Sequence, residues 1–397
     1  MKYLTLLCDG MADRDDNNGL TPMDEAKKPT MDELCSRGLT GLVSTVPSGM
    51  KPGSDVCNLA ALGYNPRECY TGRSPLEALS MGINLNDNDV SYRVNLVTLG
   101  GDGDLNELTM LDYSSGEISS DESAALIESL KSTFSPIELY AGISYRHAAV
   151  MRGGALGTEF TPPHDILGKN IAPYLPKGRY GEVFKEIINK SRAVLANHPV
   201  NIARIKKGKN PATAVWPWGE GTKPILEPFE KKFGKKGAVI SAVDLVKGIG
   251  KAGDMTVIDI PTATGTVDTD YAAKTAAAIA AFDKCDFVFL HFEGPDECGH
   301  QGDRKGKKLS IERIDELVLK PLVQNLGARG DFRLAVMPDH ATPLSVRTHT
   351  ADPIPFFVYD SRRDLGSGVS FSEKCAATTG VKLERGADVI NILFENN

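Results

Sequence analysis

Three apolar runs of this chain stop abruptly at polar residues, and this pattern constrains its fold more than any other feature. The runs are Tyr3–Cys8 before Asp9, Phe287–Phe292 before Glu293, and Arg333–Met337 before Pro338 and Asp339. Short apolar runs bounded in this way are typical of fully buried strands in a parallel sheet. Amphipathic stretches at 270–282 and 310–326 predict helices that cover both faces of that sheet. Because ligands of such sheets bind at the carboxyl ends of the strands, we expect a site where these acids stand.

The middle of the chain is more irregular than the segments on either side of it. It contains the pair Pro162-Pro163 and ends near a basic stretch at 204–209. This change of pattern predicts a smaller α+β domain at 69–208, inserted into a main α/β domain that comprises 1–68 and 209–397. We therefore expect a discontinuous main domain with a second domain between its two parts.

Composition argues against several classes of protein. The 397 residues carry a net charge of −7, whereas a nucleic-acid binder normally has a basic face. No run approaches the roughly 18 apolar residues of a membrane span. The seven scattered cysteines contain no C-x-x-C pair, which argues against a disulfide framework or a zinc–thiolate cluster. We expect a soluble, cytoplasmic protein without a nucleic-acid or membrane partner, and the sequence leaves its oligomeric state open.

Carboxylate and imidazole side chains are concentrated near two of the predicted strand ends. Asp296 and His300 are four residues apart, so on a helix both face one way and form half of a Mn²⁺ or Zn²⁺ site. Asp339 and His340 follow the third apolar run, on a turn that could offer both to cations. Either pair alone has an ordinary explanation, a capped helix start or a hydrogen-bonded loop. Together, and with His349 nearby, they predict a metal centre.

The step Gly53-Ser54-Asp55 opens an apolar helical stretch. Ser54 is therefore expected near a helix N-terminus, where backbone N–H groups favour an anionic phosphate. A serine in this place is more often an N-cap residue. The alternative is a nucleophile whose hydroxyl is activated by a bound metal rather than by a histidine base. The local sequence leaves both roles open.

These motifs resemble the alkaline phosphatase superfamily, and more narrowly the archaeal-type cofactor-independent phosphoglycerate mutases. The similarity extends over nearly the whole chain and includes the segments Leu62–Pro66, Gly72–Ala78, Tyr92–Asn95, Tyr145–His147, Pro162–Asp165, Trp216–Gly221 and Ile260–Gly265. The resemblance implies an alkaline-phosphatase-like, mostly parallel sheet. It also implies a glycolytic and gluconeogenic enzyme that interconverts 3-phosphoglycerate and 2-phosphoglycerate without 2,3-bisphosphoglycerate.

The resemblance implies roles for individual residues. Ser54 would accept the phosphoryl group, and two divalent cations would bind, Mn²⁺ first, with Zn²⁺, Mg²⁺ and Co²⁺ as alternatives. The ligands of one cation would be Asp9, Ser54, Asp339 and His340, and those of the other Asp296, His300 and His349. Candidate contacts of the small phosphorylated substrate are Arg73, Arg93, Arg146, His147, His164, Lys247, Tyr113 and Glu117.

One segment departs from the family pattern. Where members usually read Asp-Arg-x-Ala-Gly-Arg-Ile, this chain has Tyr113 and Glu117 in place of the two arginines. A guanidinium is the natural bidentate partner of a carboxylate, so its loss leaves room for another phosphoryl acceptor. A related branch resembling these mutases is proposed to act as a homoserine kinase, and Glu117 would suit the ammonium of homoserine. Equally, both residues could be surface substitutions. A metallophosphatase, in which water is the acceptor, is the third hypothesis.

Overall fold

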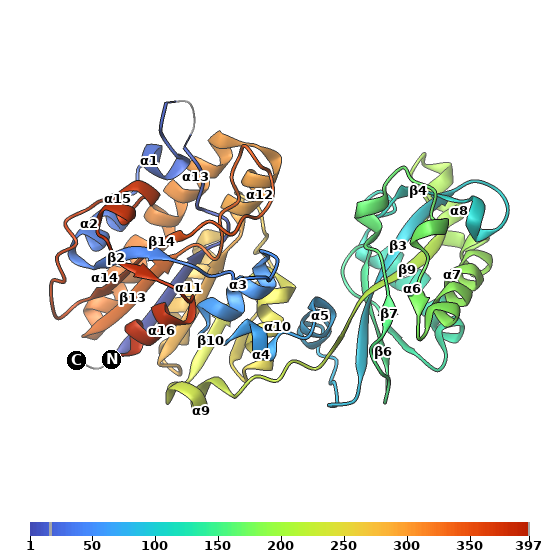
Figure 1. Cartoon of the computed structure of the whole chain (residues 1–397), viewed down its shortest axis with the longest axis horizontal. Helices are drawn as coiled ribbons and strands as arrows, with labels where there is room; N and C mark the ends of the chain where they lie inside the picture. Colours follow the sequence, from blue (N-terminus) through green and yellow to red (C-terminus); the bar gives the residue numbers. More distant parts are fainter. Residues whose placement is uncertain (16–17, 396–397) are drawn as a thin grey trace. The chain divides into compact units, whose positions relative to one another are not determined.

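The computed structural model describes residues 1–15 and 18–395, which form two compact units (Figure 1). Unit 1 comprises Met1–Tyr70 and Ile225–Asn397, and unit 2 comprises Thr71–Pro224. The insertion expected at 69–208 begins within two residues of the start of unit 2 at Thr71, but it stops short of Pro224, where unit 2 ends. The difference arises because strand β9 (Ala214–Thr222) pairs with strand β3 (Val90–Gly100), which places β9 in unit 2.

Unit 1 is built on an eight-stranded sheet in the order β11-β10-β12-β1-β13-β14-β2-β15. The strands are β1 Lys2–Cys8, β2 Leu39–Val43, β10 Gly237–Ile240, β11 Thr256–Ile258, β12 Phe287–Phe292, β13 Phe332–Met337, β14 Ile354–Asp360 and β15 Lys382–Leu383. All neighbouring pairs are parallel except those of β14, which is antiparallel to β13 and β2. The predicted mostly parallel sheet is confirmed, and the three predicted strands lie side by side at its centre.

Helices cover both faces of this sheet (Figure 1). They are α1 Pro22–Glu25, α2 Pro29–Arg37, α3 Ser54–Ala61, α4 Pro66–Cys69, α9 Phe229–Phe233, α10 Asp244–Ala252, α11 Tyr271–Ala281, α12 Gly294–Gln301, α13 Arg304–Ile314, α14 Lys320–Arg329, α15 Glu373–Thr378 and α16 Ala387–Phe394. Helices α2, α11, α13 and α14 belong to one packed group, and α3, α10 and α16 to another. The helix predicted at 270–282 is α11, and the one predicted at 310–326 spans the end of α13, a π-helical turn and most of α14.

The central strands are buried on both sides, which explains their continuous apolar sequence. In β1, Leu4 and Leu6 point into one core together with Leu290 of β12 and Val336 of β13. Leu7, on the other side of β1, is also fully buried. This double burial holds β1 rigidly, so the residues that follow it are fixed in place.

Unit 2 combines an antiparallel sheet with helices, as expected for an α+β domain. Besides β3 and β9 its strands are β4 Thr109–Asp112, β5 Glu138–Tyr140, β6 Arg146–Met151, β7 Thr158–Glu159 and β8 Lys177–Gly178, and its helices are α5 Arg73–Ser80, α6 Ser120–Phe134, α7 Gly181–Ala196 and α8 Pro199–Lys206. The sheet order is β4-β3-β6-β5, and β9 also pairs with β3. Leu130 of α6 and Phe184 of α7 pack on Tyr92 and Val94 of β3 to form the main core of this unit.

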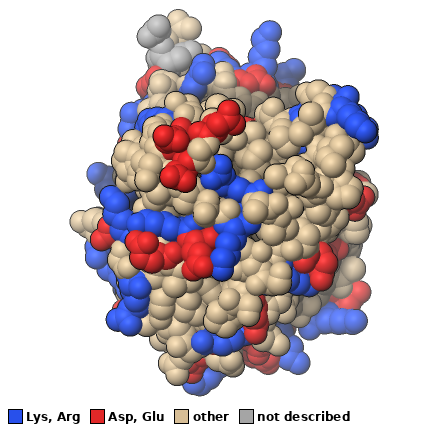
Figure 2. Space-filling view, turned by 90° about the vertical axis from the view of Figure 1, so that its right-hand side faces the viewer, with Lys and Arg blue, Asp and Glu red and all other residues tan. Residues whose placement is uncertain are grey.

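Two surface properties bear on possible partners. Within residues 1–15 and 18–395, no helix is both long and apolar enough to cross a membrane. On the face shown in Figure 2, basic and acidic side chains are interspersed rather than gathered into one basic area.

Candidate active site

Three acidic side chains come together at the carboxyl ends of the central strands of unit 1. Asp9 directly follows β1, Asp339 stands two residues after β13, and Asp296 lies in α12, which begins just after β12. The backbone N–H of Gly10 donates to Asp339 Oδ1 at 3.2 Å, which ties the ends of β1 and β13 together. The acids therefore meet at the edge of the sheet where the strand pattern predicts a ligand site.

The turn after β1 requires a glycine. Gly10 has a φ of +59°, and a Cβ at this position would lie 2.4 Å from Asp296 Oδ1 and 2.6 Å from Thr342 Oγ1. A left-handed backbone without a side chain is what glycine provides at low cost. The absence of a side chain at Gly10 thus lets the turn that carries Asp9 approach α12 closely.

A first group of ligand atoms is formed by Asp9, Asp339 and His340, all buried and mutually within 4.8 Å. His340 Nε2 lies 3.4 Å from Asp9 Oδ1 and 3.3 Å from Asp339 Oδ2. Asp9 Oδ1 is buried and accepts no hydrogen bond. Burial, reinforced by the neighbouring Asp339 and Asp296 carboxylates, raises the pKa of Asp9 well above its usual range. A cation bound here would offset this repulsion and give Oδ1 a partner, so the residues fit a metal ion.

A second group is formed by Asp296, His340 and His349, whose ligand atoms also lie within 4.8 Å of one another. His300 joins it, because its Nε2 is 3.2 Å from Asp296 Oδ2 and 3.0 Å from His349 Nε2. Although burial opposes it, hydrogen bonds from His300 and His349 hold the pKa of Asp296 well below its usual range. The same contact with Asp296 raises the pKa of His300 to about 9. Carboxylate and imidazole donors in this arrangement suit Mn²⁺ or Zn²⁺.

Ser54 is the first residue of α3, and Gly53 occupies the N-cap position without a side-chain cap. The N-cap role for Ser54 is therefore wrong. Its Oγ lies instead 3.2 Å from His340 Nε2, beside the first group of ligand atoms. Ser54 is half-buried, so its hydroxyl is held in place and still reachable. The structure thus brings together all seven residues named from the sequence as metal ligands.

Two further residues support this site and were missed by sequence reasoning. Asn58, fully buried in α3, donates through Nδ2 to the Ser54 carbonyl at 2.9 Å and to Asp339 Oδ2 at 2.8 Å. Its spacing of four residues from Ser54 on a predicted helix was a usable signal. His291, also fully buried, approaches Asp9 Oδ2 through Nε2 at 2.9 Å. Because His291 lies within the apolar run Phe287–Phe292, the sequence pattern predicts only a strand there.

Three of the predicted substrate contacts form an arginine cluster in unit 2, defined by Arg73, Arg93 and Arg146. Glu77 joins the first two, because its carboxylate lies 2.9 Å from Arg73 Nε and 2.8 Å from Arg93 Nε. Burial opposes ionisation of Glu77, yet the positive charges of Arg93, Arg73 and Arg146 lower its pKa. Three guanidinium groups around one carboxylate leave a local excess of positive charge. Such a cluster can hold an anionic group.

Aromatic rings connect this cluster to Tyr113. The Tyr113 ring lies 5.9 Å from the ring of Tyr145 and 6.2 Å from that of His164. The His164 ring lies 5.4 Å from that of Trp218, over which the Arg93 guanidinium stacks at 4.0 Å. The structure therefore brings Tyr113, His164 and Arg93 into one cluster, and Tyr113 is a packed ring rather than a solvated substitution.

The remaining predicted substrate contacts are Glu117, His147 and Lys247. Glu117 is exposed, with a φ of +48°. His147 is buried; its Nδ1 accepts the N–H of Gly142 at 3.0 Å, and burial lowers its pKa to about 3. Lys247 is in α10 of unit 1, where its Nζ lies 2.8 Å from Asp259.

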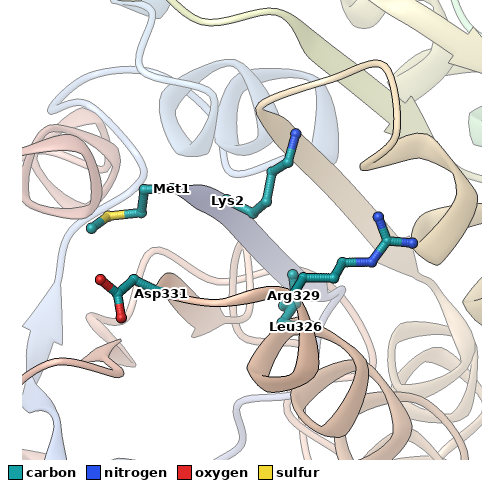
Figure 3. A pocket seen from close by; sticks show the side chains of 5 residues that line it. All are labelled: Met1, Lys2, Leu326, Arg329 and Asp331. Carbon is teal, nitrogen blue, oxygen red and sulfur yellow. The ribbon is translucent and has the colours of Figure 1, made fainter.

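A hollow of about 570 Å³ lies at the opposite end of β1 (Figure 3). It is lined by Met1, Lys2, Leu326, Arg329 and Asp331. Lys2 Nζ already donates to the Cys285 carbonyl at 2.9 Å, and Arg329 Nη1 to Asp283 at 2.6 Å. The length of β1, about 20 Å at 3.3 Å per residue, separates this hollow from Asp9. It is therefore not part of the candidate site.

Comparison with known proteins gives consistent matches. Residues 35–201 match the family described as 2,3-bisphosphoglycerate-independent phosphoglycerate mutase. The probable enzyme of that name from Geobacter sulfurreducens is 44% identical over 400 residues, covering 100% of both chains. The enzyme of that name from Methanosarcina acetivorans is 45% identical over 403 residues, again covering 100% of both.

Two solved structures are similar to this chain over nearly its whole length. The PH0037 protein from Pyrococcus horikoshii has a TM-score of 0.83 and 29% identity, covering 100% of this chain and 98% of the other. A cofactor-independent phosphoglycerate mutase from Thermoplasma acidophilum has a TM-score of 0.67 and 23% identity, covering 99% of both chains. The latter similarity shows that the two share a fold.

Proposed function

We propose, since this chain belongs to the 2,3-bisphosphoglycerate-independent phosphoglycerate mutase family, that it interconverts 3-phosphoglycerate and 2-phosphoglycerate in the cytoplasm. The observation that carries the proposal is the environment of Ser54, whose Oγ lies 3.2 Å from His340 Nε2 beside the converging carboxylates. A hydroxyl held among cation-binding groups at a helix N-terminus is suited to attack on a phosphate ester.

In the proposed reaction Ser54 carries the phosphoryl group between the two positions. The bond from phosphorus to the 3-oxygen of glycerate breaks as a bond from phosphorus to Ser54 Oγ forms, and the serine hydroxyl proton passes to the departing oxygen. The 2-oxygen of glycerate then attacks the phosphoserine, and its proton returns to Ser54 Oγ. The two steps consume no water and need no second phosphate donor.

We propose further that the site holds two divalent cations, with Mn²⁺ the first candidate and Zn²⁺, Mg²⁺ and Co²⁺ the alternatives. Their ligands would be Asp9, Ser54, Asp339 and His340 for one ion, and Asp296, His300 and His349 for the other. When bound, the ions would supply Lewis-acid stabilisation of phosphoryl charge and lower the pKa of the Ser54 hydroxyl. The unpartnered, buried Oδ1 of Asp9 supports this assignment.

The arginine cluster of unit 2 is proposed to bind the anionic groups of the substrate. Glu77 keeps the guanidinium groups of Arg73 and Arg93 in place through their Nε atoms. Trp218 supports the face of the Arg93 guanidinium. A guanidinium held through Nε and one face is preorganised, so little side-chain entropy is lost when an anion binds.

A coupled assay of the Mn²⁺-loaded protein, with 3-phosphoglycerate and no 2,3-bisphosphoglycerate, tests the proposal. Turnover in the usual enzyme range of about 1–10³ s⁻¹ supports it. Ser54→Ala should abolish turnover and the phosphoprotein trapped by acid quench, whereas Ser48→Ala, an exposed serine in the preceding loop, should leave both unchanged. Substantial mutase activity in Ser54→Ala would overturn the nucleophile assignment.

A second candidate is phosphoryl transfer to an acceptor that carries an ammonium group, such as homoserine. The packing of Tyr113 against Tyr145 and His164 favours it, because an aromatic ring at a family arginine position changes what that cluster can recognise. The same Mn²⁺-loaded protein, inactive as a mutase but active with homoserine and a phosphoryl donor, would support this candidate. Tyr113→Arg together with Glu117→Arg should then increase mutase activity.

A further inference from the structure

A row of three polar residues crosses the sheet of unit 1 at the carboxyl ends of adjacent strands. β12 lies between β10 and β1, and His291 is the penultimate residue of β12. Ser241 directly follows β10, and Asp9 directly follows β1. His291 Nδ1 lies 3.1 Å from Ser241 Oγ, and its Nε2 lies 2.9 Å from Asp9 Oδ2. All three residues are at most 1% exposed.

When Asp9 is ionised, as it would be with a cation bound, the hydrogen bonds along this row run in one direction. The backbone N–H of Val243 donates to Ser241 Oγ at 2.9 Å, which leaves the serine proton free to donate to His291 Nδ1. A neutral imidazole that accepts at Nδ1 carries its proton on Nε2. Nε2–H then donates to Asp9 Oδ2, and an ionised carboxylate can only accept hydrogen bonds. The opposite tautomer would set a lone pair of Nε2 against the carboxylate.

This direction has a consequence for the two oxygens of Asp9. Oδ2 is occupied by His291, whereas Oδ1 is buried without a hydrogen bond and lies 3.4 Å from His340 Nε2. We infer that Ser241 and His291 are positioning residues, which hold Asp9 so that Oδ1 alone is offered to the cation of the first group. This inference rests on the two-cation proposal and extends it to residues that touch neither substrate nor ion.

The inference predicts an effect on one cation only. The side-chain hydrogen bonds of His291 reach Ser241 and Asp9, and Asp296 of the second group hydrogen-bonds His300 and Thr342 instead. Partners of this kind, next to the ligands, typically contribute 10–100-fold to metal affinity. Loss of His291 should therefore weaken the ion of Asp9 and leave the other ion unchanged.

The test is titration of the metal-free, full-length chain with Mn²⁺, followed by electron paramagnetic resonance and calorimetry. His291→Leu should weaken one of two ions by about 10–100-fold, and comparison with Asp9→Asn and Asp296→Asn identifies which. His291→Gln should restore most of the affinity, because its amide N–H can donate to Asp9. Ser241→Ala should weaken the same ion by about 10-fold, at the lower end of that range.

The matched control is Ser191→Ala in unit 2. Ser191 is also fully buried, and its Oγ likewise accepts a backbone N–H, that of Val215 at 3.1 Å. This variant should lose stability but bind both ions as the wild type does. If His291→Leu fails to fold, His291→Gln and Ser241→Ala still carry the test.

Two results would overturn the inference while the two-cation proposal stands. One is two ions bound with wild-type affinity in the absence of the His291 or Ser241 side chain. The other is equal weakening of both ions, which indicates a general structural defect. A wild-type chain that binds no Mn²⁺ overturns the inference and the two-cation proposal together.

Discussion

Replacing Gly10 by alanine should destabilise the chain in two ways, through its left-handed backbone and through a steric clash with α12. The left-handed backbone, at φ +59°, costs an L-residue about 1–2 kcal/mol. The new Cβ would also lie 2.4 Å from Asp296 Oδ1 and 2.7 Å from the Asp296 Cα. The shifts that such overpacking forces on its neighbours typically cost a further ~1–3 kcal/mol. We therefore expect Gly10→Ala to lower the free energy of unfolding by about 2–5 kcal/mol, the sum of these two terms.

A second glycine provides the matched control for this measurement. Gly234 has a similar φ of +65°, and a Cβ there would meet no atom within 4 Å. Gly234→Ala should thus show the backbone cost alone, about 1–2 kcal/mol. Urea unfolding followed by circular dichroism gives both values, and Mn²⁺ titration reports the site. Equal destabilisation of the two variants, with normal Mn²⁺ binding in Gly10→Ala, would refute the argument that Gly10 lets Asp9 approach α12.

Three other substitutions test separate parts of the structure. Asn58→Leu removes the donor to Asp339 Oδ2 and should lower kcat about 10–100-fold with little change in KM; an unchanged kcat contradicts the positioning role. Glu77→Ala releases Arg73 and Arg93 and should raise KM for phosphoglycerate about 10-fold more than it lowers kcat, whereas an unchanged KM argues against the cluster as the anion site. Burial raises the pKa of Glu373 to about 7 from an ordinary value of 4.5. Between these two pH values the folded chain keeps a proton that the unfolded chain releases, so the free energy of unfolding should fall as pH rises from about 4.5 to 7. Glu373→Gln should remove that fall in urea unfolding curves at pH 5 and pH 8, and the same slope in the variant would show that another group titrates.

The central strands and their acids could be predicted because their signals are local. Strands β1, β12 and β13 are buried on both faces, which requires continuous apolar sequence, and each is followed directly by a polar residue or by a turn that carries one. The spacing of Asp296 and His300 likewise predicts their common face on α12, where their side chains lie 3.2 Å apart. Such features depend only on neighbours in sequence.

Other features depend on pairing between distant segments and could not be predicted. The end of unit 2 at Pro224 is set by β9, which pairs with β3 more than a hundred residues earlier. His291 looked like one polar residue within a strand, and only the order β10-β12-β1 places it between Ser241 and Asp9. The role of Ser54 was open for the same reason, since the contact that distinguishes it comes from His340.

The position of β1 at the centre of the sheet also constrains how the chain is made. Tyr3 pairs with Phe287 on one side and Arg333 on the other, so both partners of β1 are synthesised some 280 residues later or more. At 5–20 residues per second this is a delay of roughly 15–60 s. Unit 2, continuous from Thr71 to Pro224, is complete well before that delay ends. On the ribosome, β1 therefore remains an unpaired apolar strand, and it is the segment that we expect a chaperone to shield during translation.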